Sequence, residues 1–222
     1  AVGYQSMYST TTGNGRNVAV GAGAMYTNTT GYQNVAVGYN SLRAQTTGYM
    51  NVAVGESAFT GMTTGYEGVA VGFGSGVANT TGAQNTFLGS YAGNVNTTAG
   101  SNTILGASAG RANTTGALNT FVGTHAGTTN TTGTQNTAIG QAALRVNTTG
   151  SYNTAVGRES LLASTTSTYN TAIGRQTLQA MTTGDQNTAV GNGALASATT
   201  CTGNTAVGSG AGDAITTAHH NT

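Results

Sequence analysis

A few residues of this 222-residue chain have types and spacings that could support catalysis. The stretch GASAG at 106–110 matches the G-x-S-x-G pattern that presents a nucleophilic serine, here Ser108, and His125 follows seventeen residues later. A serine nucleophile also needs an acid that orients its histidine, and the sequence carries none near these two residues. GSYAG and GTHAG replace the serine by Tyr and His at the equivalent places in neighbouring segments. We therefore predict that the chain is not an enzyme.

Metal and cofactor chemistry is equally poorly supported. His219 and His220 are adjacent, whereas zinc needs three or four converging ligands. The acidic residues do not recur at one place in the sequence, as they would in calcium-binding glycine repeats. They are Glu56, Glu67, Glu159, Asp185 and Asp213. A phosphate-binding loop with its lysine is excluded because the chain has no lysine. The prediction is no metal and no cofactor.

Composition excludes further classes of function. Charged residues make up 5% of the chain and the formal net charge is +1, so there is no basic footprint for nucleic acid. No apolar run approaches the roughly 18 residues of a membrane-spanning helix, and we predict no membrane insertion. A single cysteine, Cys201, excludes an internal disulfide framework.

The dominant feature of the sequence is a repeat. The motif AVG, or an equivalent, ends at a glycine that recurs first after 18 residues and then every 17. These glycines are Gly3, Gly21, Gly38, Gly55, Gly72, Gly89, Gly106, Gly123, Gly140, Gly157, Gly174, Gly191 and Gly208. The extra residue falls near 13–16. We interpret 1–222 as a single repeat array of about 13 coils. Because neither end carries a polar capping repeat, we expect it to be part of a longer fibre.

We number the repeat from its Thr-Thr pair, so that residues 29–45 occupy positions one to seventeen. Positions six to nine, for example 34–37, are rich in β-branched residues and end at the invariant glycine of position ten, which predicts a short strand. A second short strand is expected at positions twelve to fifteen, as in 41–43. The NTTG segment has the residues of a turn. Strands and turns recurring with this period predict an all-β, parallel β-solenoid.

The side chains at two positions of the repeat vary in size in opposite directions. Position eight is usually Ala but is Phe87, Ile104 and Phe121 in three consecutive repeats, and position fourteen of those repeats is glycine instead of Leu or Met. Side chains that share one close-packed volume must compensate in this way, so position eight is predicted to face the interior. The repeats with Ala70 and Gly76, and with Ala206 and Gly212, do not follow the exchange.

The predicted strand is apolar on its other face as well. Position nine is always Val, Ile or Leu, and position seven is Val or Thr. Since side chains alternate along a strand, both positions should face away from the interior of the coil. A strand that is apolar on both faces belongs to a sheet covered on both sides. We therefore expect partner chains to cover this second face.

The repeat resembles sequences of known fibres. The segments NTAIGQAAL at 136–144 and NTTG at 147–150 resemble repeats of phage tail fibres and bacterial surface fibres. The core NTAVG is also similar to the SVAIG-type repeats in the heads of trimeric autotransporter adhesins. That family implies a left-handed parallel β-roll, three chains side by side with the apolar strand facing the trimer axis, and an extracellular location.

Three sets of residues are candidates for surface or ladder roles. Tyr32, Tyr49 and Tyr66 share position four and should form an aromatic ladder that can contact a glycan, although packing of the rings on one another is the simpler explanation. The N-x-T pattern makes the position-seventeen asparagines, expected on the outside, candidates for N-glycosylation or simply turn residues. They are Asn28, Asn79, Asn96, Asn113, Asn130 and Asn147. The position-six asparagines are predicted to form an internal amide ladder.

These features favour a structural, adhesive extracellular fibre or shaft at a cell surface or in a virion tail. It would associate with itself, as a homotrimer or end to end, and hold a binding tip away from the surface. One alternative is a filament that binds cell-surface glycans or is coated with them. Another is an ice-binding solenoid, because Thr-Thr pairs recur in most coils, although those threonines precede a glycine in a predicted turn.

Overall fold

The computed structural model describes residues 1–11 and 15–222, and that part of the chain contains strands and turns but no helix. Part of the predicted insertion near 13–16 lies outside the described residues. Each strand is three residues long and coincides with positions seven to nine of a repeat. The strands are β1 (Val18–Val20), β2 (Val35–Val37), β3 (Val52–Val54), β4 (Val69–Val71), β5 (Thr86–Leu88), β6 (Thr103–Leu105), β7 (Thr120–Val122), β8 (Thr137–Ile139), β9 (Thr154–Val156), β10 (Thr171–Ile173), β11 (Thr188–Val190) and β12 (Thr205–Val207).

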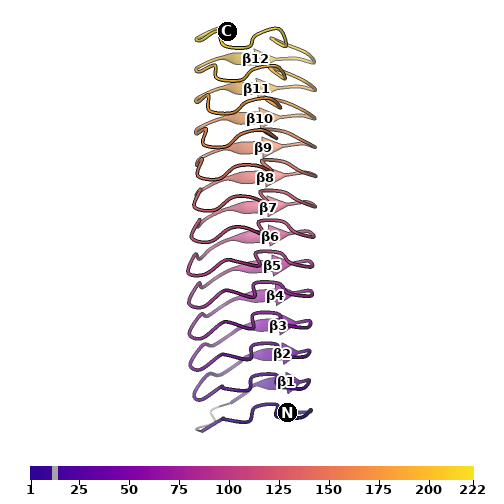
Figure 1. The fold of residues 1–222 in the computed structure, drawn as a ribbon, viewed down its shortest axis with the longest axis vertical. Coiled ribbons are helices and arrows are strands. Elements are labelled where there is room, and N and C mark those ends of the chain that lie inside the picture. Colours follow the sequence, from indigo (N-terminus) through magenta and orange to yellow (C-terminus); the bar gives the residue numbers. More distant parts are fainter. Residues whose placement is uncertain (12–14) are drawn as a thin grey trace. The chain divides into compact units, whose positions relative to one another are not determined.

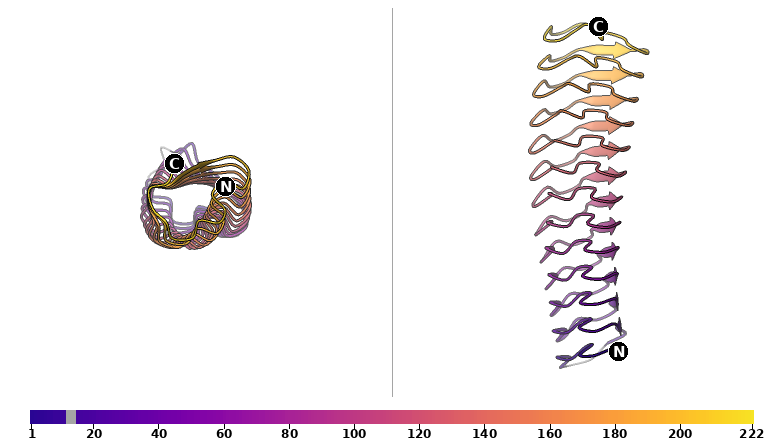
Figure 2. Two further views of the ribbon diagram at one scale, coloured as in Figure 1. Left: turned by 90° about the horizontal axis from the view of Figure 1, so that it is seen from above. Right: turned by 45° about the vertical axis from the view of Figure 1, so that its right-hand side comes forward.

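The chain forms two compact units, Ala1–Thr115 with β1 to β6 and Gly116–Thr222 with β7 to β12. Within each unit the strands of successive coils lie directly over one another, with one strand in each coil after the first of the chain (Figure 1). Seen along the stack, the coils of a unit overlie one another (Figure 2). The pairing is parallel and in register, so that Val35 pairs with Val52 and Ala138 with Ala155. This arrangement confirms the predicted parallel β-solenoid with a 17-residue repeat.

The number of turns is slightly lower than predicted. The chain makes about eleven turns rather than thirteen. The first repeat contributes only an isolated bridge between Val2 and Val20 instead of a strand.

The interior of the coils is built as the size exchange predicts. The middle residue of every strand is buried, whether it is small, as in Ala36, or large, as in Phe121. A Cβ atom added to Gly127 would lie 2.7 Å from the ring of Phe121, and one added to Gly93 would lie 2.7 Å from Phe87. Glycine at position fourteen is therefore required wherever position eight carries a ring.

The two repeats that break this rule are explained by the neighbouring coils. A Cβ atom on Gly76 would lie 2.6 Å from Phe59 of the preceding coil and 2.7 Å from Phe87 of the following coil. A Cβ atom on Gly212 would lie 2.8 Å from Leu195, one coil earlier. The volume is shared between coils as well as within one, a relation that inspection of single repeats misses.

The prediction of a second strand at positions twelve to fifteen is wrong. Residues 39–44 form turns, and Asn40 and Leu42 have left-handed φ values of 54° and 47°. Such values interrupt an extended strand. The backbone still pairs between coils, since Leu42 N donates to Ala58 O at 3.0 Å. The coils are thus joined by hydrogen bonds on this side without strand geometry.

The invariant glycine of position ten has two structural reasons. Gly38 has a φ of 130°, which side-chain-bearing residues rarely adopt. A Cβ atom there would also lie 2.5 Å from the carbonyl oxygen of Gly55 in the next coil. Any other residue would therefore be strained and would push the coils apart.

Candidate functional site

The residues with catalytic spacing occupy ordinary places in the repeat. Ser108 lies at position twelve in a turn with a φ of 55°, close to the 58° of Tyr91 and the 61° of His125 at the same position of their repeats. The conformation of Ser108 is therefore that of the repeat and not a distinct nucleophile turn. Ser108 belongs to the first unit and His125 to the second.

The histidine pair has a local structural contact. His219 Nδ1 accepts a hydrogen bond from the backbone N–H of Thr202 at 3.0 Å, and the rings of His219 and His220 are 6.4 Å apart. Within the described ranges 1–11 and 15–222, no group of three or more His, Cys, Asp or Glu side chains is placed to hold a metal ion. The same residues include no helix long and apolar enough to cross a membrane.

The predicted amide ladder at position six is confirmed. Asn34 Oδ1 accepts from the backbone N–H of Asn51 at 2.9 Å, and Asn51 Nδ2 donates to Gly65 O at 2.8 Å. Each buried side chain thus binds the backbone of the next coil at two points, a carbonyl at position three and an N–H at position six. The second unit continues this pattern with Asn136, Asn153, Asn170, Asn187, Asn204 and Asn221.

One repeat lacks this asparagine for a steric reason. Gly68 occupies position six there, and a Cβ atom on it would lie 3.1 Å from the ring of Phe59. The backbone N–H of Gly68 still donates to Asn51 Oδ1 at 2.8 Å. The ladder of the first unit stops at this coil and resumes at Asn85.

The position-seventeen asparagines do not lie on the outside, so that part of the prediction is wrong. All six candidates are fully buried. They are Asn28, Asn79, Asn96, Asn113, Asn130 and Asn147. Asn147 Nδ2 donates to Asn130 Oδ1 at 2.7 Å and to Gly150 O at 2.9 Å.

The side chain turns inward because its amide binds the carbonyl of the turn that follows it. Asn28 Nδ2, for example, donates to Gly31 O at 3.1 Å. A glycan on Nδ2 has no space in the folded coil, and we do not include N-glycosylation in the proposed function. The signal for burial was present in the sequence, because other repeats carry Met62 and Met181 at this position.

The two threonines of the Thr-Thr pair have different roles. The first threonine bonds the next coil, as Thr29 Oγ1 donates to Thr46 O at 3.0 Å and Thr148 Oγ1 to Thr165 O at 3.0 Å. The second threonine, for example Thr30, is exposed. The threonines of position one therefore form a ladder of hydrogen bonds between coils, in addition to the amide ladder of position six.

The predicted tyrosine ladder is also confirmed. The ring centroids of Tyr32 and Tyr49, and of Tyr49 and Tyr66, are 5.1 Å apart, with interplanar angles of 3° and 6°. Burial raises the pKa of Tyr49, and charges on Tyr32, Tyr66 and Glu67 raise it further. Because the rings cover one another's faces, a sugar can stack only on the outer face of an end ring.

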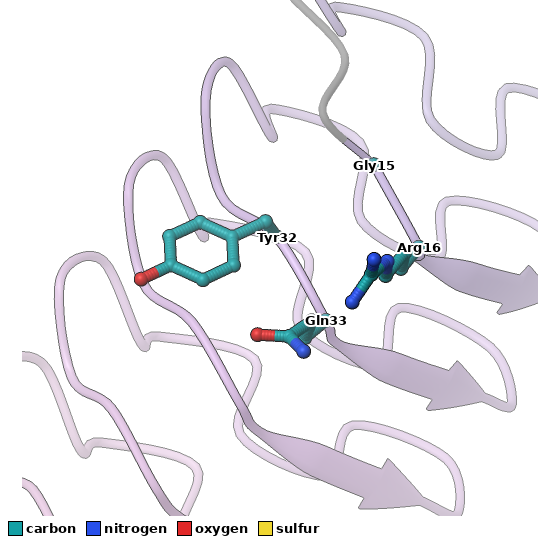
Figure 3. Close-up of a pocket in the computed structure, with 4 residues that line it drawn as sticks. All are labelled: Gly15, Arg16, Tyr32 and Gln33. Atoms are coloured by element: carbon teal, nitrogen blue, oxygen red, sulfur yellow. The ribbon is translucent and has the colours of Figure 1, made fainter.

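One end of this ladder is open. Position four of the preceding coil is Gly15, which offers no ring to cover Tyr32. Gly15, Arg16, Tyr32 and Gln33 line an open hollow there, with the side chains of Arg16, Tyr32 and Gln33 extending from two neighbouring coils (Figure 3). This hollow is one place on the ladder that a glycan ring could reach; at the other end the residue after Tyr66 in the column is Ala83, which also has no ring.

The outward face of the strands forms an open surface in a single chain. Positions seven and nine are partly or fully exposed along both units, while position eight between them is buried. Val18 is 48% exposed and Ile173 40%. We call the outward side chains of positions seven and nine the strand face. It has the apolar character that the sequence predicts.

Charged residues lie on the surface in small clusters. Arg158 pairs with Glu159 at 2.7 Å, and Gln176 Nε2 donates to Glu159 Oε2 at 2.9 Å. The hydrogen bonds from Gln176 and Arg158 lower the pKa of Glu159. Arg43 lies 5.3 Å from the ring centroid of Tyr26. The contacts of Gln176 with Glu159 and of Arg43 with Tyr26 join neighbouring coils.

Comparison of this chain with protein-family models, with curated proteins and with solved structures found no match. The candidate sites are therefore the strand face and the open end of the tyrosine ladder, judged by their own geometry.

Proposed function

We propose that this chain is a structural, non-catalytic segment of an extracellular fibre or shaft, which holds a binding tip away from a cell or virion surface. The observation that carries the proposal is that buried and partly buried polar side chains join the coils. Asn34 to Asn51 and Thr29 to Thr46 are two such links within one coil step. Coils joined within each unit by side-chain and backbone bonds suit a load-bearing shaft. The resemblance to phage and bacterial fibre repeats supports the same function.

We further propose that the strand face is the surface through which copies associate. It presents a column of Val, Leu or Ile at position nine in every coil, next to a column of Val or Thr. Large contiguous apolar surfaces on soluble chains are usually covered by a partner. A homotrimer around this face, extended end to end, is the arrangement that the adhesin resemblance favours.

Sedimentation equilibrium of the intact chain tests this proposal. The expected result is a mass of three chains that persists on dilution. A monomer at all concentrations would contradict association through the strand face. Negative-stain images of the same sample should then contain uniform filaments or short shafts.

Ice binding is a second candidate. The Thr-Thr pairs are expected to lie in turns, but a different set of threonines, at position seven, lies on the strands. The hydroxyls of Thr137, Thr154 and Thr171 lie outward on in-register strands and make no hydrogen bond within the described part of the chain. On the same face of each of these strands, position nine is Val or Ile rather than a second threonine. The same face cannot both bind ice and be covered by another copy. Thermal hysteresis of a monomeric sample decides between them, and its absence excludes ice binding.

A further inference from the structure

Among residues 1–11 and 15–222, four pairs of tyrosines stack on each other one coil apart. The ring centroids are 4.8–5.3 Å apart, and the interplanar angles are 3–7°. The pairs are Tyr8 with Tyr26, Tyr32 with Tyr49, Tyr49 with Tyr66, and Tyr152 with Tyr169. The in-register parallel coils produce this geometry, because like positions of successive repeats lie one strand spacing apart.

The stacked rings are accessible as well as close. Tyr152 is 47% exposed and Tyr169 is 56% exposed, and the end rings Tyr32 and Tyr66 are each 37% exposed. A pair thus combines two nearly parallel rings, whose centroids are about one strand spacing apart, with access for a reagent from solution.

From this geometry we propose that the stacked tyrosines are sites of oxidative cross-linking between coils, with hydrogen peroxide and a haem peroxidase as the oxidant. The oxidant removes one electron and one proton from each phenol of a pair. The two tyrosyl radicals join through a carbon–carbon bond between their ortho carbons, and the ring hydrogens then return to the oxygens by tautomerisation. One peroxide accepts the two electrons and two protons and leaves as two waters.

The product is a dityrosine that closes a loop of one coil. It links residues seventeen apart, as Tyr152 and Tyr169 are. Such a link restricts the unfolded chain in the way a disulfide does. The chain has a single cysteine, Cys201, and it is buried, so it offers no disulfide of its own for this purpose. Cross-linking would therefore add covalent joints to a stack that is otherwise held by hydrogen bonds and packing.

The second unit offers a clean test. The chain has no lysine, so trypsin cuts only after arginine. Cuts after Arg145, Arg158 and Arg175 release peptides 146–158 and 159–175, each of which contains one tyrosine. We expect peroxidase treatment of the intact protein to yield these two peptides joined, with a mass lower by two hydrogen atoms than their sum and with dityrosine fluorescence.

Matched variants and isotope labelling identify the source of the link. Tyr169→Phe keeps a ring in the stack but should abolish this joined product, while the link between Tyr32 and Tyr49 persists. Tyr39→Phe is the control, because Tyr39 is 56% exposed and its neighbours one coil away are Ala22 and Glu56. It should leave every link unchanged.

Three results would overturn the proposal. One is oxidation of tyrosines without the joined peptides. Another is equally frequent linkage of Tyr39, which would mean that exposure alone decides the reaction. The third is joined peptides that mix labelled and unlabelled chains in a sample prepared from both, which would place the link between molecules. Cross-linked protein should also unfold at a higher temperature than untreated protein, and Tyr49→Phe should reduce that shift.

Discussion

Position four of the repeat does different work in the two units. In the first unit it carries Tyr32, Tyr49 and Tyr66, whose rings stack on one another. In the second unit it carries acceptors that bind the backbone of the preceding coil. Asp185 Oδ1 accepts from the N–H of Thr168 at 2.6 Å, and His219 Nδ1 accepts from that of Thr202 at 3.0 Å. One outward position is thus stabilised by apolar stacking in one unit and by hydrogen bonds in the other.

The strand face also varies along the chain. Position seven is Val in β1 to β4, but Thr in β5 and β6 of the first unit and in β7 to β12 of the second. The inward positions do not change, because Asn51 in the first unit and Asn153 in the second make equivalent bonds to the next coil. The comparison indicates that inward columns determine the fold, while outward columns are free to specialise.

The largest effect is expected from removing an inward amide. Asn153→Ala leaves the N–H of Asn170 and the carbonyl of Ser167 buried without their partner, at 3.1 and 2.8 Å in the native coil. Each lost partner costs about 1–3 kcal/mol, so we expect a loss of about 3 kcal/mol in the free energy of unfolding. Denaturant titration measures it.

The same change in the first unit tests whether the inward columns are equivalent. Asn51→Ala should cost a similar amount, because Gly68 N and Gly65 O lose their partner. The outward control Thr154→Ala should stay within about 0.5 kcal/mol of the native protein. If Asn51→Ala left the free energy of unfolding unchanged, the amide ladders of the two units would not be equivalent.

The size exchange should produce the next largest effect. Gly127→Leu places a side chain against Phe121, whose ring is 2.7 Å from a Cβ atom there, and should destabilise the protein by about 2 kcal/mol. Adding Phe121→Ala should recover most of this loss, because the pair then matches Ala138 and Leu144 of the next coil. Thermal unfolding of the single and double variants measures the recovery.

A control separates the clash from backbone strain. Gly193 also has a positive φ, 66°, but a Cβ atom there would meet nothing within 4 Å. Gly193→Ala should therefore cost no more than about 1 kcal/mol. If the double variant is no more stable than Gly127→Leu alone, positions eight and fourteen do not share a volume.

The strand face is expected to control association and not folding. Val52→Glu in β3 puts a charge into the proposed interface, where an unpaired buried charge is costly. We expect self-association at least about tenfold weaker, a change of about 1.4 kcal/mol, with little change in the unfolding of dissociated chains. Thr47→Glu, at the exposed second threonine, is the control. Equal weakening by both variants would point to general charge repulsion.

The smallest effect concerns Glu159 on the surface of the second unit. Its folded-state pKa is lowered by the hydrogen bonds from Gln176 and Arg158. The stability from this carboxylate is therefore present above its unfolded pKa and is lost as the pH falls through the lower folded pKa. Glu159→Gln should flatten the acid part of the stability profile slightly, measured by thermal unfolding at several pH values. Glu56→Gln serves as the exposed control, and an identical profile for native protein and Glu159→Gln would contradict the role of these contacts.

Much of the fold follows from columns of like residues. Once the 17-residue period is known, the strands, the amide ladder from Asn34 and the stacked Tyr32, Tyr49 and Tyr66 are predictable, because repetition places like positions one strand spacing apart. The size exchange is predictable for the same reason.

Two features could not be predicted this way. The turn at positions twelve to fourteen depends on left-handed residues such as Leu42, and leucine has no preference that marks such a conformation. The inward turn of Asn28 depends on its bond to Gly31 O, which only the folded loop creates. The N-x-T pattern alone suggested the opposite orientation. The sequence signal that should have outweighed this pattern is the apolar Met62 at the same position, which is buried in the structure.

Electron cryomicroscopy of the native assembly tests the central claim most directly, because a cross-section shows how many chains lie side by side and which face points inward. The account predicts several copies with the Val, Thr, Leu and Ile side chains of the strand face turned toward one another and position four turned outward. Isolated single chains, or an assembly with the strand face turned to solvent, would contradict it.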